Sequence, residues 1–107
     1  MTNQCQNPNV KSKYNLAERT SKYGADIIIF TKNIKETNIN RPIISQLIRS
    51  ATSMGANYME ADCAESKKDF IHKIGICKKE AKETTHWLYM LATANPELKE
   101  KCRQYRL

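Results

Sequence analysis

The chain has 107 residues, with 18 Lys and Arg against 11 Asp and Glu, and a formal net charge of +7. This length accommodates one domain with one hydrophobic core, and no apolar run approaches the roughly 18 residues that a membrane-spanning helix needs. The polar N-terminus holds no apolar segment of the secretory kind, so we expect a cytoplasmic protein. The excess of positive charge favours an anionic partner, with a merely well-solvated surface as an equally weighted alternative.

Residues 1–11 are polar, and we expect them to form a flexible N-terminal tail ahead of a single domain that covers residues 12–107. The four cysteines have no CxxC spacing, and two of them fall on apolar helix faces. We therefore expect free thiols in a reducing compartment rather than a disulfide framework.

The first helix is expected from Asn15, whose side chain can cap the first turn together with Glu18, to about Glu36. Gly24 lies inside this helix, where it costs about 1 kcal/mol relative to Ala, and close approach of another helix would explain it. The apolar seam has the spacing four, three, four, three, four, which is typical of bundle helices. Its members are Leu16, Thr20, Tyr23, Ile27, Phe30 and Ile34.

A second helix is expected over residues 42–65, with Pro42 in its first turn. Up to Met59 it carries one charged side chain, Arg49, and apolar or small residues lie nearly all round it. A helix on the outside of a small soluble domain should instead have one apolar stripe and one charged face. We therefore expect the surplus uncharged surface to meet another copy of the chain.

Arg49 needs a partner, because a lone cation in an apolar surface is costly to bury. Glu60 is one candidate, within the chain or in a neighbouring copy. With Ser53 and Asn57 these side chains are interpreted as a polar network at an oligomer interface. A catalytic cluster is the less favoured interpretation, because no nucleophile and base are paired.

A third helix is expected from a Ser66 cap, with Asp69 in its first turn, to about Ala94. Asn95 and Pro96 are then typical of a further helix start, but the chain ends inside that helix's pattern. Short loops place consecutive helices side by side. The sequence therefore predicts an all-α fold, an antiparallel up-down-up-down four-helix bundle with a shortened fourth helix. The third seam is Phe70, Ile74, Cys77, Ala81, Thr84, Leu88 and Leu91.

When the residues of the third helix are placed around its axis at 100° per residue, its positive and negative charges fall on different sides. One flank and the back carry lysines, a candidate surface for nucleic acid, with a solvated lysine face as the alternative. The other flank carries Ile76 and Trp87 among acidic residues, which resembles a protein contact. The candidate nucleic-acid residues are Lys67, Lys68, Lys78, Lys79 and Lys82.

A di-iron site would need two Glu-x-x-His motifs and further inward Glu residues on other helices. Glu83 and His86 match once, and the looser pair Asp69 and His72 lies on the same helix, away from the seam. No phosphate-binding glycine loop, HExxH motif or catalytic triad is present. We therefore expect no metal, no cofactor and no catalytic residues.

Two segments, QLIRSATSMGANYMEA at 46–61 and SKKDFIHKIGICKKEAKETTHWL at 66–88, together with Arg19 and Thr20, resemble a bacterial four-helix-bundle family, the 23S rRNA intervening-sequence (S23) proteins. His86 departs from the aromatic residue common in that family, and the fourth helix is shorter. The resemblance implies a homopentamer. It also extends to the accessory protein of diversity-generating retroelements, a basic pentamer that engages reverse transcriptase and nucleic acid.

The expected function is therefore a non-enzymatic homo-oligomer, most simply a pentamer, whose basic surface binds RNA or DNA. The alternative is a scaffold that holds a partner enzyme and has no role with nucleic acid. The interface of the oligomer is expected to include Arg49, Ser53, Asn57, Glu60, Ile76 and Trp87.

Overall fold

The structure is a computed structural model that describes residues 15–107, and the expected tail at residues 1–11 lies outside this range. The described residues form four α-helices and one short 3-10 helix, without a strand. These elements are α1 at Leu16–Lys32, α2 at Asn40–Asp62, α3 at Lys67–Ala94, η1 at Pro96–Leu98 and α4 at Lys99–Tyr105.

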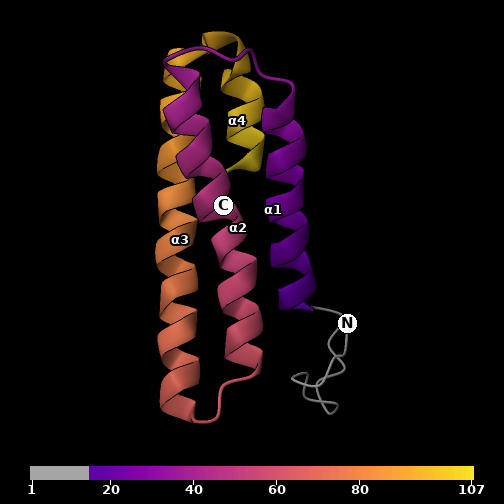
Figure 1. Ribbon diagram of the computed structural model, residues 1–107, viewed down its shortest axis with the longest axis vertical. Helices are drawn as coiled ribbons and strands as arrows, with labels where there is room; N and C mark the ends of the chain where they lie inside the picture. Colours follow the sequence, from indigo (N-terminus) through magenta and orange to yellow (C-terminus); the bar gives the residue numbers. More distant parts are fainter. Residues whose placement is uncertain (1–14) are drawn as a thin grey trace.

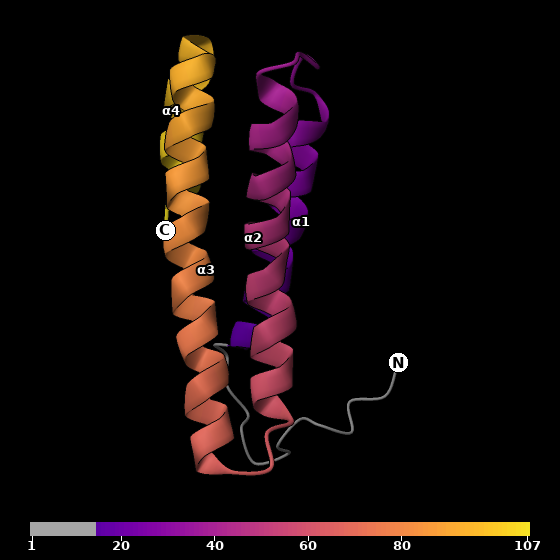
Figure 2. The same ribbon diagram turned by 60° about the vertical axis from the view of Figure 1, so that its left-hand side comes forward.

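The connections between successive helices lie alternately at the two ends of the molecule (Figure 1). The central helix α2 packs against both α1 and α3, whereas α4 packs on α3; turned by 60°, the molecule shows α1 beside α2 and α4 beside α3 (Figure 2). The molecule measures 45 × 23 × 21 Å. The 28 residues of α3 span about 42 Å at 1.5 Å per residue, so α3 runs through nearly its whole length.

Two predicted helix caps are present. The Asn15 side chain accepts a hydrogen bond from the backbone N–H of Glu18 at 3.1 Å. The Ser66 hydroxyl accepts one from the N–H of Asp69 at 3.0 Å. Each bond satisfies one of the four N–H groups that a helix start leaves without a partner, so local sequence fixes where α1 and α3 begin.

The connection between α1 and α2 differs from the prediction. α1 ends at Lys32, before the expected Glu36, and Ile34 packs against the core from the loop. α2 begins at Asn40, two residues before the expected Pro42. Just before the helix, the Thr37 hydroxyl accepts a hydrogen bond from the N–H of Asn40 at 2.9 Å. α2 also ends at residue 62 rather than 65.

Asn95 does not cap the fourth helix as the sequence predicts. Its amide instead pairs with that of Asn40, which is only 2 % exposed, through reciprocal bonds of 2.7 and 3.1 Å. The remaining amide hydrogens reach the carbonyls of Lys35 and Leu91. This fully bonded pair joins the start of α2 to the end of α3, while the chain after it forms η1 before α4.

The hydrophobic core lies at the end of the molecule that α4 covers (Figure 1). At seven residues, α4 is only about 10 Å long and leaves the other end open. Two seam residues there, Leu16 and Phe70, are 42 % and 40 % exposed. The buried cluster consists of Ile27, Phe30, Leu47, Ala51, Leu88, Leu91 and Cys102.

The helices α1 and α2 approach each other closely at two glycines. A Cβ atom built on Gly24 would lie 3.2 Å from the Cα of Thr52. One built on Gly55 would lie 3.1 Å from the Cα of Ser21 and 2.9 Å from its hydroxyl oxygen. The predicted reason for a glycine inside the first helix, close approach of another helix, is therefore confirmed.

Candidate functional site

The outward face of α2 is exposed and contains almost no charge. Ser45, Thr52 and Ala56 are exposed, as is Met59 at 44 %. Only Arg49 interrupts this face between residues 42 and 59. In a surface with both signs of charge elsewhere, a strip of uncharged side chains with a single cation in it marks a candidate contact surface.

Arg49 pairs within the chain with two carboxylates of α3. Its guanidinium lies 3.1 Å from the Glu80 carboxylate, contacts Glu83 and donates to the Gln46 side chain at 3.1 Å. Glu80 is only 8 % exposed, so its charge requires this partner. The proposed Arg49–Glu60 pairing within the chain is therefore wrong, because the register of α2 against α3 brings Glu80 and Glu83 beside Arg49.

Trp87 is joined to the same group. Its indole N–H donates to the Glu83 carboxylate at 3.3 Å, and its ring meets that of His86 edge-on at 4.8 Å between centroids. Trp87 packs against the core and is half-buried, as is Ile76. Part of this apolar flank therefore already serves the core, and the rest remains accessible.

The other three residues assigned to the interface form separate bonds. The Asn57 side chain donates to the backbone carbonyl and hydroxyl of Ser53, at 2.9 and 3.1 Å. Glu60 pairs with Lys73 of α3 at 2.7 Å, and this hydrogen bond raises the pKa of Lys73. The expected single network of Arg49, Ser53, Asn57 and Glu60 is therefore divided into three parts within one chain.

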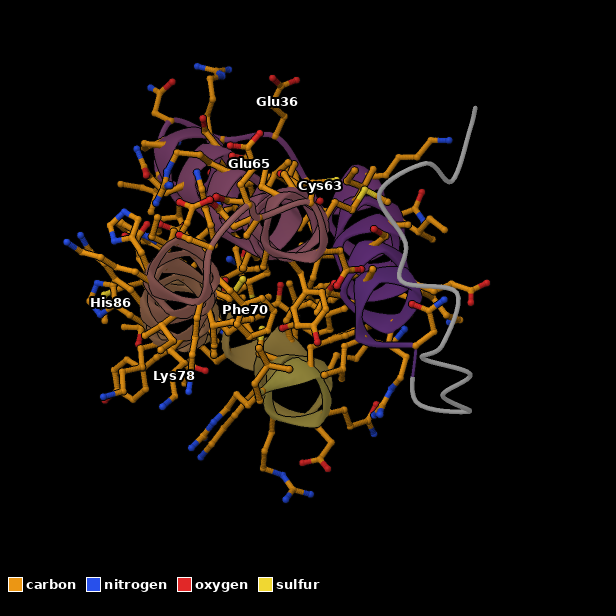
Figure 3. The ribbon with its side chains drawn as sticks, turned by 90° about the horizontal axis from the view of Figure 1, so that it is seen from below. Glu36, Cys63, Glu65, Phe70, Lys78 and His86 are labelled. Carbon is orange, nitrogen blue, oxygen red and sulfur yellow. The ribbon has the colours of Figure 1, made fainter. Side chains whose placement is uncertain are left out.

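The five candidate lysines are exposed, and none forms an ion pair with another residue in 15–107. Lys67 and Lys68 lie at the N-terminal end of α3, whereas Lys78, Lys79 and Lys82 follow about 15 Å further along it at 1.5 Å per residue. Seen along the bundle, Lys78 lies on the side of α3 toward α4, and His86 points outward (Figure 3). The structure thus separates the lysines into an end group and a central group.

Two of the cysteines are free and one is not. Cys77 and Cys102 carry free thiols, and burial raises the pKa of each, which keeps both thiols protonated and poorly nucleophilic near neutral pH. Cys63 is disulfide-bonded. The expectation of free thiols is wrong there: α2 ends before Cys63, which is exposed rather than buried on a helix face.

Residues 15–107 contain no group of three or more His, Cys, Asp and Glu side chains placed to hold a metal ion. His72 and His86 are both exposed on α3. No helix within the described part of the chain is long and apolar enough to cross a membrane.

The sequence profile of one family matches residues 12–105, almost the whole chain. The chain belongs to the 23S rRNA-intervening sequence protein family. This agrees with the resemblance seen in the two segments of α2 and α3 and with the four-helix fold. Neither the curated proteins nor the solved structures that were searched contain a significant match.

A groove that the sequence did not indicate lies below the end of α4. It has a volume of about 480 Å³ and opens where a longer fourth helix would cover the seams of α1 and α3. The observation that the fourth helix is short could have indicated it. Its lining includes Leu16, Tyr23, Met54, Tyr58, Ile74 and Leu107, with Arg19 and Lys78 among the polar residues.

Proposed function

We propose that this protein is a non-enzymatic, antiparallel up-down-up-down bundle that assembles as a homopentamer and binds RNA or DNA. In this proposal the uncharged face of α2, with Arg49, Ser53, Asn57 and Glu60, lies at or near the contact between copies. The Ile76 and Trp87 flank of α3 borders that contact. The five lysines of α3 stay outside the contact and meet the nucleic acid.

One contrast supports this assignment of the two surfaces. The exposed face of α2 has a single cation, Arg49, which Glu80 and Glu83 already neutralise. The exposed lysines of α3 have no such partners in residues 15–107. An interface excludes unpaired charge, whereas binding to phosphates requires it, so the two surfaces fit different partners.

The assembly is tested by light scattering. Five copies of the 12.3 kDa chain have a mass of about 62 kDa. Ala56→Glu places a charge on the exposed face of α2 and should lower the mass toward that of one chain. Ala25→Glu, at another exposed alanine inside a helix, is the matched control and should leave the mass unchanged. A 12 kDa particle for the unaltered protein at micromolar concentration contradicts the proposal.

Nucleic-acid binding is tested by fluorescence anisotropy with labelled fragments of 23S rRNA. Substituting Lys78, Lys79 and Lys82 together by Glu should weaken binding and make it less dependent on salt. The slope of log affinity against log salt concentration should fall by about 0.7–0.9 for each phosphate that is no longer neutralised. A triple variant with Glu at three exposed α1-side positions, Lys22, Lys32 and Lys35, has the same net charge and should bind more nearly like the original protein. Affinity that is insensitive to salt and to both variants contradicts the electrostatic mechanism.

The alternative function, a scaffold for a partner enzyme, is favoured by the accessible part of the Ile76 and Trp87 flank. The ratio of absorbance at 260 and 280 nm of the purified protein separates the two functions, because bound nucleic acid raises it. A ratio typical of protein alone, together with one co-purifying enzyme that Trp87→Ala releases, would favour the scaffold.

A further inference from the structure

A second groove lies between the C-terminal part of α3 and α4, and we call it the α3–α4 groove. Its volume is about 320 Å³. Buried Leu88 and Cys102 form its apolar floor. Tyr89 stands beside them and is 63 % exposed. The remaining lining residues are Ala92, Thr93, Lys99, Arg103 and Arg106.

The α4 side of this groove is basic. Lys99 and Arg103 are four residues apart and lie on one side of α4, and Arg106 follows directly after the helix ends at Tyr105. All three line the groove. Glu100 pairs with Arg103 through bonds of 2.6 and 3.1 Å. No carboxylate in residues 15–107 is within salt-bridge distance of Lys99 or Arg106. Two cations at the groove are therefore available to an anion, and a third is partly neutralised.

The α3 side continues this charge along the bundle. Lys78, Lys82 and Tyr89 are spaced by four and seven residues and share one face of α3. They extend over about 16 Å at 1.5 Å per residue. Lys78 lies on the side of α3 toward α4 (Figure 3). The exposed ring of Tyr89 thus stands in a line of cations contributed by two helices.

We propose that the α3–α4 groove binds a single strand of RNA or DNA, with one base stacked on Tyr89 and the adjoining phosphates on Lys82, Lys99 and Arg106. An aromatic ring exposed beside cations is how proteins hold single strands, because an unpaired base offers its face for stacking. A duplex keeps its base faces inside the helix and would meet only the cations. The inference rests on the proposed nucleic-acid binding and names the form of nucleic acid.

The test uses the full chain and a fluorescein-labelled 12-nucleotide strand of mixed pyrimidines, as RNA and as DNA, each alone and annealed to its complement. Tyr89→Ala should weaken single-strand binding by about 5- to 150-fold, the loss expected for one stacked base. Tyr89→Phe retains the ring and should bind within about twofold of the original protein. Duplex binding should change by less than about twofold in both variants.

The cations are tested separately. Substituting Lys99 and Arg106 by Gln should lower affinity for both forms and reduce the single-strand salt slope by about 1.4, since each neutralised phosphate contributes about 0.7. The control substitutes Lys32 and Lys35 by Gln, which removes the same amount of charge from the end of α1 and the loop after it. This variant should leave the salt slope nearly unchanged.

The outcomes separate this inference from the proposed function. If Tyr89→Ala leaves single-strand affinity unchanged while Glu at the central lysines weakens it, the groove assignment is overturned and nucleic-acid binding stands. Tighter binding of duplex than of single strand also overturns it. If the unaltered protein binds neither form, both proposals are wrong. Should Tyr89→Ala unfold the chain, Tyr89→Leu replaces it, because Leu keeps apolar bulk and lacks an aromatic face.

Discussion

Replacing Gly55 by Ala tests the closest approach between α1 and α2. The new methyl group would lie 3.1 Å from both the Cα and the backbone nitrogen of Ser21, and backbone atoms inside a helix cannot rotate away. Extra carbon in a tightly packed site costs about 1–3 kcal/mol. Ala in place of Gly inside a helix gains about 1 kcal/mol. The net expectation for Gly55→Ala is a loss of up to about 2 kcal/mol.

Gly75→Ala is the matched control, because it makes the same substitution inside α3. A Cβ atom at this position has no heavy atom within 4 Å among those it could meet, so only the gain in helix propensity remains. Gly75→Ala should therefore raise the free energy of unfolding by about 1 kcal/mol. In a domain of this size that shifts the melting temperature by about 4–8 °C.

The measurement is urea unfolding followed by circular dichroism, at one protein concentration for all variants because assembly links stability to concentration. The two variants should change stability in opposite directions. Gly24→Ala, whose nearest backbone contact is 3.2 Å, should fall between them. If Gly55→Ala stabilises the protein as much as Gly75→Ala does, α1 and α2 do not approach as closely as described.

Three further predictions concern polar contacts that join distant parts of the chain. Asn40→Ala leaves the partner amide of a buried pair unsatisfied and should lower the free energy of unfolding by about 1–3 kcal/mol in urea titrations; an unchanged midpoint contradicts this. Tyr23 donates to the Tyr105 carbonyl at 2.7 Å, and burial, with a smaller contribution from Tyr105, raises its pKa from 10.0 to about 12. The stabilisation that the Tyr23 hydroxyl gives the fold is therefore complete below pH 10 and lost as the pH rises toward 12. Tyr23→Phe should lower the free energy of unfolding by about 1 kcal/mol at pH 7 and should reduce the fall in stability between pH 10 and 12. Arg49→Ala should lower the free energy of unfolding by about 1–3 kcal/mol, because it leaves the Glu80 carboxylate without its cation. This magnitude lies between the contributions of surface and of buried ion pairs. Gln46→Ala, which removes only a neutral contact, is the control.

The parts of the fold that could be predicted from sequence depend on neighbouring residues. The caps at Asn15 and Ser66 are formed by side chains that bond three residues ahead, so the starts of α1 and α3 follow from local pattern. Heptad spacing likewise identified core residues such as Ile27 and Leu88, which are fully buried. The end of α1 could not be predicted, because Ile34 leaves the helix to pack against a core built from other segments.

The candidate site was less predictable because its pairings depend on register between helices. Glu80 lies 31 residues from Arg49 in sequence, and only the packing of α2 on α3 makes it the partner in place of Glu60. Asn95 has the sequence of a helix cap, yet a tertiary amide pair with Asn40 takes its side chain instead. The exposure of the lysines followed from periodicity alone.

The shortness of α4 also has a consequence for how the protein opens. Cooperative local unfolding begins where few apolar contacts hold the backbone, and at the end that α4 does not reach, the seam residues Leu16 and Phe70 remain 42 % and 40 % exposed. Amide hydrogens in the first turns of α1 and α3 should therefore exchange with solvent well before those around Leu88 and Leu91. Lys67 and Lys68 stand on the end that we expect to open first, whereas Tyr89 follows Leu88, which lies in the buried core.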